Sequence, residues 1–194
     1  MNYPNKKNQF ERDKVSVKRR GMTFESLIDE SNTFYLNQNI AVIHKKPTPI
    51  QVVHVDYPKR QLAKITEAYY KTPSTTDYNG VYKGHYIDFD VKESINKTSF
   101  PIRNIHQHQY EHLKNVHNQG GIAFLLIHFK SQNTLHLLPF KALNYFYERS
   151  KKGRKSISYD ELLKESLLIK ESYRPSIDYL KAVDILLKER KLEK

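Results

Sequence analysis

The spacing of hydrophobic residues along the chain predicts alternating helices and strands. Apolar side chains recur every three or four residues across 24–35, which predicts a helix capped by Thr23. A short apolar run at 40–44 predicts a buried strand, and strict alternation across 85–94 predicts another strand. Residues 1–20 lack such periodicity and are rich in Lys and Arg, so we expect them to form a flexible basic arm.

The rest of the chain shows the same helical spacing and strand alternation of hydrophobic residues. Helical spacing across 103–118 places Gln109 on the buried face with Ile105 and Leu113, where an amide needs a hydrogen-bond partner. Further strands are expected at 120–129 and 134–140, and further helices at 140–149, from the capping box of Ser158 and Glu161, and from near Ser176. This order predicts a single α/β domain over 21–194, with a mixed central β-sheet flanked by helices.

One segment, 45–71, departs from this pattern. Its first part alternates like a strand but is interrupted by Pro47, Pro49 and Pro58. Because proline has no backbone N–H to give to a sheet, this density of prolines favours an edge element that protrudes from the fold. Residues 61–71 are ambiguous between strand and helix. We therefore expect an insertion that projects from the domain.

The charge of the chain narrows the choice of partner. The 194 residues include 33 Lys and Arg against 21 Asp and Glu, a formal net charge of +12. Such an excess indicates a polyanionic partner, most often nucleic acid. The 14 Tyr and 9 Phe residues agree with nucleic-acid binding, although Tyr is also a common half-buried strand residue.

The composition also excludes several classes of protein. Without cysteine, the chain has no disulfide, thiolate metal site, iron–sulfur cluster or cysteine nucleophile. No glycine-rich phosphate loop is present, and no apolar run is long enough to span a membrane. His108 and His112 stand four residues apart but lack the surrounding pattern of a zinc site. Since the first residues do not resemble a signal peptide, we expect a cytoplasmic protein.

The candidate chemistry lies on the alternating strand. Alternation places Asp88, Asp90 and Lys92 on one face, with Asp90 and Lys92 about 7 Å apart along the strand. An isolated pair of this kind is most often the solvated outer face of an antiparallel strand. An upstream acid changes this interpretation, because Asn79-Gly80 predicts a tight turn that folds Asp77 back beside Asp90.

Two carboxylates and a lysine are the groups that metal-dependent phosphodiester hydrolysis needs. Carboxylate oxygens are hard ligands suited to Mg²⁺, which lowers the pKa of a bound water and neutralises charge on the phosphate. A nearby lysine can orient that water and offset developing charge. The arrangement of Asp77, Asp90 and Lys92 matches the signature of the PD-(D/E)XK nucleases, with Thr76 in place of the proline.

Longer stretches of the sequence are more specific than this signature. Between about residues 20 and 187 the chain closely resembles the RecU family of Holliday-junction resolvases of low-GC Gram-positive bacteria. The segments that carry the resemblance are SNTFYLNQNIAVIHKKPTP (31–49), VDYPKR (55–60), TPSTTDYNGVYKGHYIDF (72–89), NKTSFP (96–101) and RPSIDYLKAVD (174–184).

The resemblance implies a homodimeric endonuclease with a PD-(D/E)XK, restriction-endonuclease-like core. Each subunit is expected to nick one of two opposed strands of a four-way DNA junction, using Mg²⁺ or Mn²⁺. By the same resemblance, the metal ligands are Thr75, Asp77, Asp90 and Gln109, and the catalytic residues are Asp77, Asp90 and Lys92. Glu25, on the first helix, and Asp88 are further candidates for the site.

The resemblance also implies how the protein holds branched DNA. The family builds a stalk that projects into the junction centre, which matches 45–71, and Arg60 matches a stalk arginine that modulates the RecA recombinase. A branch-migration helicase is a further expected partner. The basic residues expected to contact DNA are Lys45, Lys46, Lys59, Arg60 and Lys64 in the stalk, and Lys14, Lys18, Arg19 and Arg20 in the arm at 1–20.

Two departures from the family pattern leave alternatives open. Family members carry Glu where this chain has Asp90, and a side chain shorter by one methylene must draw the metal or the backbone closer. The arm at 1–20 is also shorter than usual. The chain is therefore a junction-resolving endonuclease of recombination and repair, a catalytically weak or inactive protein that binds junctions or recombinase, or a restriction-type endonuclease that cuts duplex DNA.

Overall fold

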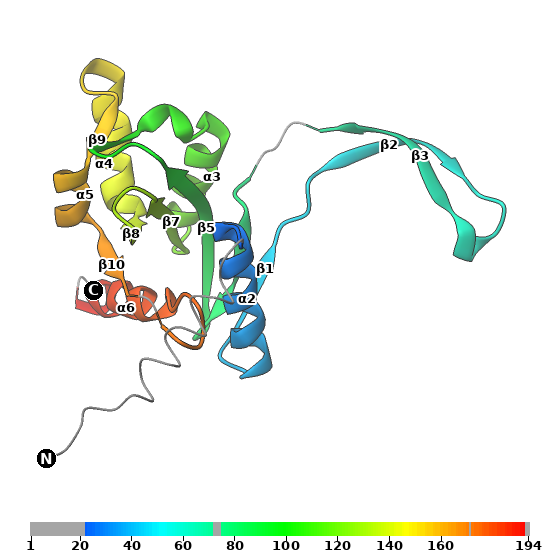
Figure 1. Ribbon diagram of the computed structural model, residues 1–194, viewed down its shortest axis with the longest axis horizontal. Helices are drawn as coiled ribbons and strands as arrows, with labels where there is room; N and C mark the ends of the chain where they lie inside the picture. The colour runs from blue at the N-terminus through cyan, green and yellow to red at the C-terminus, as the bar shows by residue number, and fades with distance from the viewer. Residues whose placement is uncertain (1–21, 72–74, 171, 193–194) are drawn as a thin grey trace, which may run out of the picture.

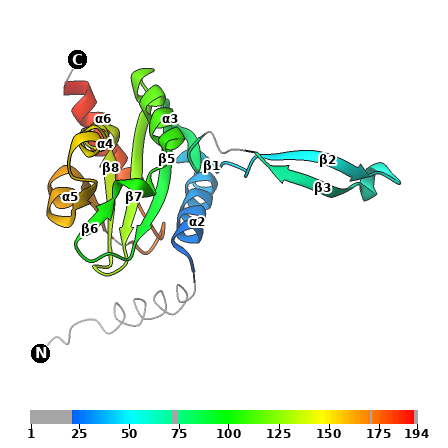
Figure 2. The same cartoon turned by 90° about the horizontal axis from the view of Figure 1, so that it is seen from above.

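The computed structural model describes residues 22–71, 75–170 and 172–192 of the chain. A six-stranded sheet forms its centre, with helices on both faces and a long two-stranded hairpin that projects to one side (Figures 1 and 2). The basic arm expected at 1–20 lies outside the described residues. None of the described helices is long and apolar enough to cross a membrane.

The central sheet is mixed, as the order of elements predicts. Strands β5 (His85–Ser94) and β7 (Ile122–Phe129) run parallel, whereas the other neighbouring pairs are antiparallel. The sheet order is β1 (Ala41–Lys45), β4 (Tyr78–Tyr82), β5, β7, β8 (Thr134–Pro139) and β10 (Leu167–Ile169). A separate short ladder joins β6 (Ser99–Pro101) to β9 (Ser156–Ser158).

Helices cover the two faces of the sheet and enclose two hydrophobic cores. Helices α2 (Phe24–Asn37) and α6 (Leu180–Leu192) pack on one face, where β5 contributes Ile87, Phe89 and Val91. Helices α3 (Gln107–Asn118), α4 (Phe140–Lys152) and α5 (Tyr159–Glu165) pack on the other face. Short 3₁₀ turns lie at Arg60–Leu62 and Ile102–Asn104. Both faces of the central strands are therefore covered.

The helix ends follow the capping signals in the sequence. The Thr23 hydroxyl accepts a hydrogen bond from the Ser26 N–H at 3.2 Å, and Ser158 and Glu161 form the expected capping box before α5. The last helix begins at Leu180, later than the expected start near Ser176. The apolar run at 40–44 forms β1, but as an edge strand whose residues are only partly buried.

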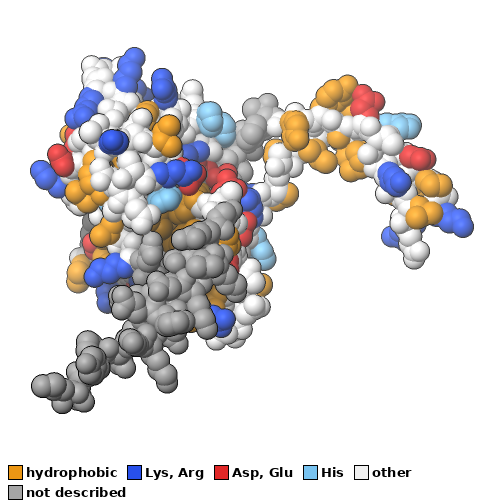
Figure 3. All heavy atoms as spheres, viewed as in Figure 1, with side chains coloured by type: hydrophobic (Ala, Val, Ile, Leu, Met, Phe, Trp, Pro, Cys, Tyr) orange, Lys and Arg blue, Asp and Glu red, His pale blue; other side chains and the backbone are white. Residues whose placement is uncertain are grey.

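The projecting hairpin confirms the interpretation of the proline-rich segment. It pairs β2 (Ile50–Asp56) with β3 (Lys64–Tyr70) in antiparallel register, so the ambiguous residues 61–71 mostly form a strand. Every residue of both strands is exposed, and Figure 3 shows both hydrophobic and charged side chains on the surface of the hairpin. The hairpin begins later than 45, because Lys45 still pairs with Tyr78 in the central sheet.

The tight turn predicted at Asn79-Gly80 is in fact at Lys83-Gly84. Lys83 and Gly84 have φ values of 48° and 76°, the conformation that a two-residue hairpin turn requires. Gly80 instead lies within β4, opposite Ile43 of β1. A Cβ atom on Gly80 would lie 2.0 Å from the Val42 carbonyl oxygen. Glycine is needed at this position for the close approach of two strands, which sequence alone does not distinguish from a turn.

We predict that Gly80→Ala destabilises the protein by roughly 1–3 kcal/mol, because β1 must move away from β4 to admit a methyl group. The measurement is urea unfolding followed by circular dichroism. Val81→Ala, at an exposed neighbour in the same strand, is the control and is expected to cost less than about 1 kcal/mol. Equal stabilities for Gly80→Ala and the unmodified protein would contradict the packing argument.

Candidate active site

The pairing of β4 with β5 brings the candidate carboxylates together. Tyr78 lies opposite Phe89 in this ladder, so Asp77, just before β4, lies beside Asp90. The N–H of Val91 donates to Asp77 Oδ2 at 3.3 Å. The predicted proximity of Asp77 and Asp90 is confirmed, although the turn that produces it is not the one expected.

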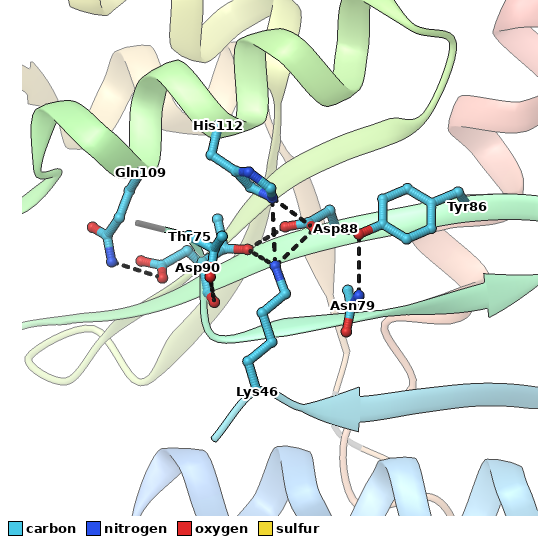
Figure 4. Close-up of polar contacts among 9 residues, drawn as sticks. Lys46, Thr75, Asn79, Tyr86, Asp88, Asp90, Gln109 and His112 are labelled. Atoms are coloured by element: carbon cyan, nitrogen blue, oxygen red, sulfur yellow. Dashed lines mark hydrogen bonds and ion pairs between the residues drawn. The ribbon is translucent and has the colours of Figure 1, made fainter. Parts of the chain in front are cut away.

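Asp90 is fully buried and held by two neighbours. The Lys92 ammonium lies 2.6 Å from Asp90 Oδ2, and the Gln109 side-chain amide donates to Asp90 Oδ1 at 3.0 Å. Lys92 also donates to Gln109 Oε1 at 3.0 Å, which closes a ring of three side chains. Gln109 is on the buried face of α3, as its helical position predicts, and Asp90 is its partner (Figure 4). Asp90 therefore does not lie on the solvated outer face of an antiparallel strand, because α3 covers this face of β5.

The pKa of Asp90 is raised to about 7. Burial is the main cause, because the sheet and α3 remove the water that would solvate the charged form. The Lys92 ammonium opposes this rise, and the neighbouring Asp77 carboxylate adds to it. Asp90 therefore resists ionisation unless a further cation lies beside it.

The available donor atoms fit a hard divalent cation. Asp90 Oδ2 is buried and has no hydrogen-bond partner, although it is ion-paired with Lys92. Within the described ranges there is no group of three or more His, Asp or Glu side chains that could hold a metal. Two carboxylates, completed by neutral oxygen ligands such as water, are a set that Mg²⁺ accepts more readily than Zn²⁺.

Asp88 lies in a different environment from Asp90. It is fully buried, and its Oδ1 accepts a hydrogen bond from the Thr76 hydroxyl. Its Oδ2 accepts from the Lys46 ammonium at 2.9 Å and from the Tyr86 hydroxyl at 2.8 Å, and it lies 3.0 Å from His112 Nε2 (Figure 4). Both oxygens of this candidate ligand are therefore occupied by side chains.

The remaining candidates fall into two groups. Glu25, on α2, forms an ion pair with Lys45 at 2.7 Å, and Lys45 also lies 3.6 Å from Asp29. Lys45 and Lys46 therefore lie in and beside the central sheet rather than on the hairpin. Residues Lys59, Arg60 and Lys64 are on the hairpin, at or near its tip, and are exposed.

Sequence reasoning missed the group of side chains around Asp88. Tyr86 carried a signal, since it stands two residues before Asp88 on the same face of β5. His112 stands three residues after Gln109, so the two side chains lie on the same side of α3. Lys46 carried no local signal, because its contact with Asp88 joins residues 42 positions apart.

Comparison with known proteins shows which family the chain belongs to. A model of the family described as "RecU: Recombination protein U" matches residues 19–185. The chain belongs to the RecU family. Relatives named Holliday junction resolvase RecU, from Staphylococcus aureus strains JH9 and MRSA252, are each 57% identical over 169 residues, which cover 87% of this chain and 81% of theirs. The resemblance seen in the sequence is thereby confirmed.

A solved structure of the Holliday junction resolvase Hjc from Archaeoglobus fulgidus is a more distant match. It is 13% identical and has a TM-score of 0.36, over 54% of this chain and 78% of that chain.

We predict a pH-dependent stability difference between this RecU-family chain and its Asp90→Asn variant. The unfolded carboxyl loses its proton near the ordinary value of 3.8, but the folded carboxyl does so near 7. The bound proton therefore stabilises the fold at low pH, and this contribution is lost as the pH rises to 7. Urea unfolding in metal-free buffer should show the variant gaining up to about 4 kcal/mol over the parent between pH 4 and 8. A difference that stays constant over this range would contradict the raised pKa.

Proposed function

We propose that the protein is a structure-selective, divalent-metal-dependent endonuclease that resolves four-way DNA junctions in recombination and repair. The observation that carries the proposal is the convergence of Asp77, Asp90 and Lys92 at one end of the β4–β5 pair. Membership of the RecU family, with relatives named Holliday junction resolvase, selects branched DNA as the substrate. The net charge of +12 suits a polyanionic substrate.

In this proposal, the side chains around Asp90 have separate roles. Asp77, Asp90 and Thr75 hold Mg²⁺, for which Mn²⁺ can substitute, and the ion supplies an acidic bound water and neutralises charge on the scissile phosphate. The Lys92 ammonium keeps Asp90 oriented and offsets negative charge that develops on the phosphate. Gln109 fixes the positions of both side chains through its amide, and its oxygen completes the metal shell if the amide turns over.

The role of Gln109 depends on which amide atom faces Asp90. As it lies, its nitrogen donates to Asp90 and its oxygen accepts from Lys92 and from the His106 N–H, at 3.0 and 3.2 Å. An amide in this orientation positions the catalytic pair rather than binding the cation. Gln109 therefore serves as a ligand only after Lys92 and His106 release its oxygen.

Paired nicks require two copies of the site. One chain supplies one group of Asp77, Asp90 and Lys92, whereas resolution cuts two opposed strands symmetrically, so the active form is a homodimer with two-fold symmetry. The hairpins then reach the centre of the junction with Lys59, Arg60 and Lys64, and Arg60 provides a contact for the RecA recombinase. A branch-migration helicase supplies the junction, in the bacterial cytoplasm near the nucleoid.

The first test of this function is Asp77→Asn. Loss of one of two carboxylate ligands removes several kcal/mol of transition-state stabilisation, so nicking of a four-way junction in Mg²⁺ should fall by at least about 100-fold. Binding measured by gel shift should persist, because the hairpin and the basic surface remain. Asp160→Asn, at an exposed carboxylate in the first turn of α5, is the matched control.

Other outcomes of this assay separate the alternatives. If the unmodified protein binds the junction without nicking it in Mg²⁺ or Mn²⁺, it is a binding protein and not an enzyme. If it cuts linear duplex DNA at defined sites as well as it cuts the junction, it is a restriction-type nuclease. If Asp77→Asn nicks at the normal rate, the assignment of the site is wrong.

A second prediction concerns the tip of the hairpin. Neutralising Lys59, Arg60 and Lys64 together, each by substitution to Gln, should weaken junction binding and reduce the salt dependence of the binding constant by about one unit of slope per lost phosphate contact. Fluorescence anisotropy across a series of salt concentrations measures this slope. Lys83→Gln with Lys181→Gln is the control, since both lysines are already ion-paired at the surface, with Asp184 and Asp178. An unchanged slope would remove the hairpin tip from the DNA interface.

A further inference from the structure

The root of the hairpin rests on the loop that carries Asp77. Lys45 is the last residue of β1 and pairs with Tyr78, the first residue of β4. One position further out, the N–H of Lys46 donates to the Asp77 carbonyl oxygen at 2.7 Å. The chain then turns away into the hairpin. The backbone of Lys46 therefore lies directly against the backbone of a candidate metal ligand.

The side chain of Lys46 points back into the domain rather than out along the hairpin (Figure 4). Its ammonium donates to the Thr76 hydroxyl at 2.9 Å and to Asp88 Oδ2 at 2.9 Å. Thr76 immediately precedes Asp77, and Asp88 stands two residues before Asp90 on the same face of β5. One ammonium group therefore connects the two chain segments that carry the candidate catalytic carboxylates.

The Lys46 ammonium donates two hydrogen bonds inside the domain and has a third polar neighbour. Besides Thr76 and Asp88, the Lys46 nitrogen lies 3.4 Å from His112 Nε2, and its side chain is only 17% exposed. A lysine held in this way has at most one of its three donors left for a DNA phosphate. Asp88 in turn is fully buried and needs a countercharge. These contacts favour an internal role for Lys46 over the DNA contact expected from its sequence position.

Thr76 makes the connection possible. A threonine hydroxyl can donate to Asp88 and accept from Lys46 at the same time, which the proline of the PD-(D/E)XK signature cannot do. The hydroxyl is buried with its residue 3% exposed. Thr76 is therefore held by both Asp88 and Lys46, and the next residue, Asp77, is held in the register that faces Asp90.

We propose that Lys46 is a positioning residue of the nuclease site, which acts through Thr76 and Asp88 to hold Asp77 against Asp90. The proposal rests on the proposed nuclease function. Because Lys46 stands where the chain leaves the central sheet for the hairpin, it also joins the element that would enter the junction to the residues that would cut it. The role is distinct from metal binding and from phosphate contact.

The test is single-turnover cleavage of a four-way junction by full-length dimeric protein at saturating enzyme concentration. Lys46→Gln should lower the cleavage rate by about 10- to 100-fold, the size of effect that a small misplacement of a catalytic group produces. It should also raise the Mg²⁺ concentration needed for half-maximal rate, with the junction dissociation constant unchanged. Lys181→Gln, which removes a surface ion pair, is the control for the loss of a lysine charge.

A double-mutant cycle identifies the path of the effect. If Lys46 acts through Thr76, then Lys46→Gln and Thr76→Val together should lower the rate no more than the larger single change does. If Lys46→Gln alone fails to fold, Lys46→Met with Asp88→Asn removes both buried charges, and this pair should fold and still cleave slowly.

Several outcomes would overturn the proposal. The first is that Lys46→Gln cleaves at the parent rate, and the second is that its loss of rate matches a fall in junction affinity. The third is that the rate losses of Lys46→Gln and Thr76→Val multiply in the double variant. The fourth is that a folded Lys46→Met, Asp88→Asn pair cleaves at the normal rate. If the unmodified protein does not cleave junctions, the proposed function fails instead, and the two failures are thereby distinguished.

Discussion

The register between β4 and β5 is the constraint on which the candidate site depends. Tyr78, Phe89 and Phe124 stack face to face across three neighbouring strands, with ring centroids 5.0 and 4.8 Å apart. A slip of one residue would turn these rings out of the core and point Asp88 and Asp90 toward α2 and α6. The aromatic stack therefore fixes the position of the carboxylates, although it lies on the opposite face of the sheet.

Within this register, the two aspartates of β5 have different neighbours. Asp88 is saturated by four side chains and serves the structure. Asp90 keeps one buried oxygen without a hydrogen bond, beside a second carboxylate and a lysine. Two identical residues, two positions apart on one face of a strand, thus differ in whether they can accept a cation. Each carboxylate has a lysine beside it, so the difference comes from the three further side chains that bond to Asp88 and from the approach of Asp77 to Asp90.

The sequence predicts the fold class and the pairing of Asp77 with Asp90, because both depend on local periodicity and on one hairpin. It predicts the position of Gln109 for the same reason. It fails for Gly80, because a glycine needed for close strand contact has the same local appearance as a turn glycine. It fails also for Lys46, whose neighbours in sequence belong to a basic, proline-rich insertion while its partner Asp88 is 42 residues away. A contact between residues that lie on either side of the hairpin in the sequence leaves no periodic signal in the pattern of hydrophobic residues.

The position at which the hairpin is inserted has a consequence for how this part of the chain can vary. The ends of the insertion, Lys46 and Asp77, are joined by a backbone hydrogen bond of 2.7 Å. Strands β1 and β4 are antiparallel neighbours in the central sheet, so the hairpin leaves and re-enters the domain at adjacent strand ends. Because the entropy of closing a loop rises only slowly with its length, residues can be added to or removed from this segment at small cost to the sheet. The hairpin is therefore a module, whose length and surface can change while the strands that carry the candidate carboxylates keep their register.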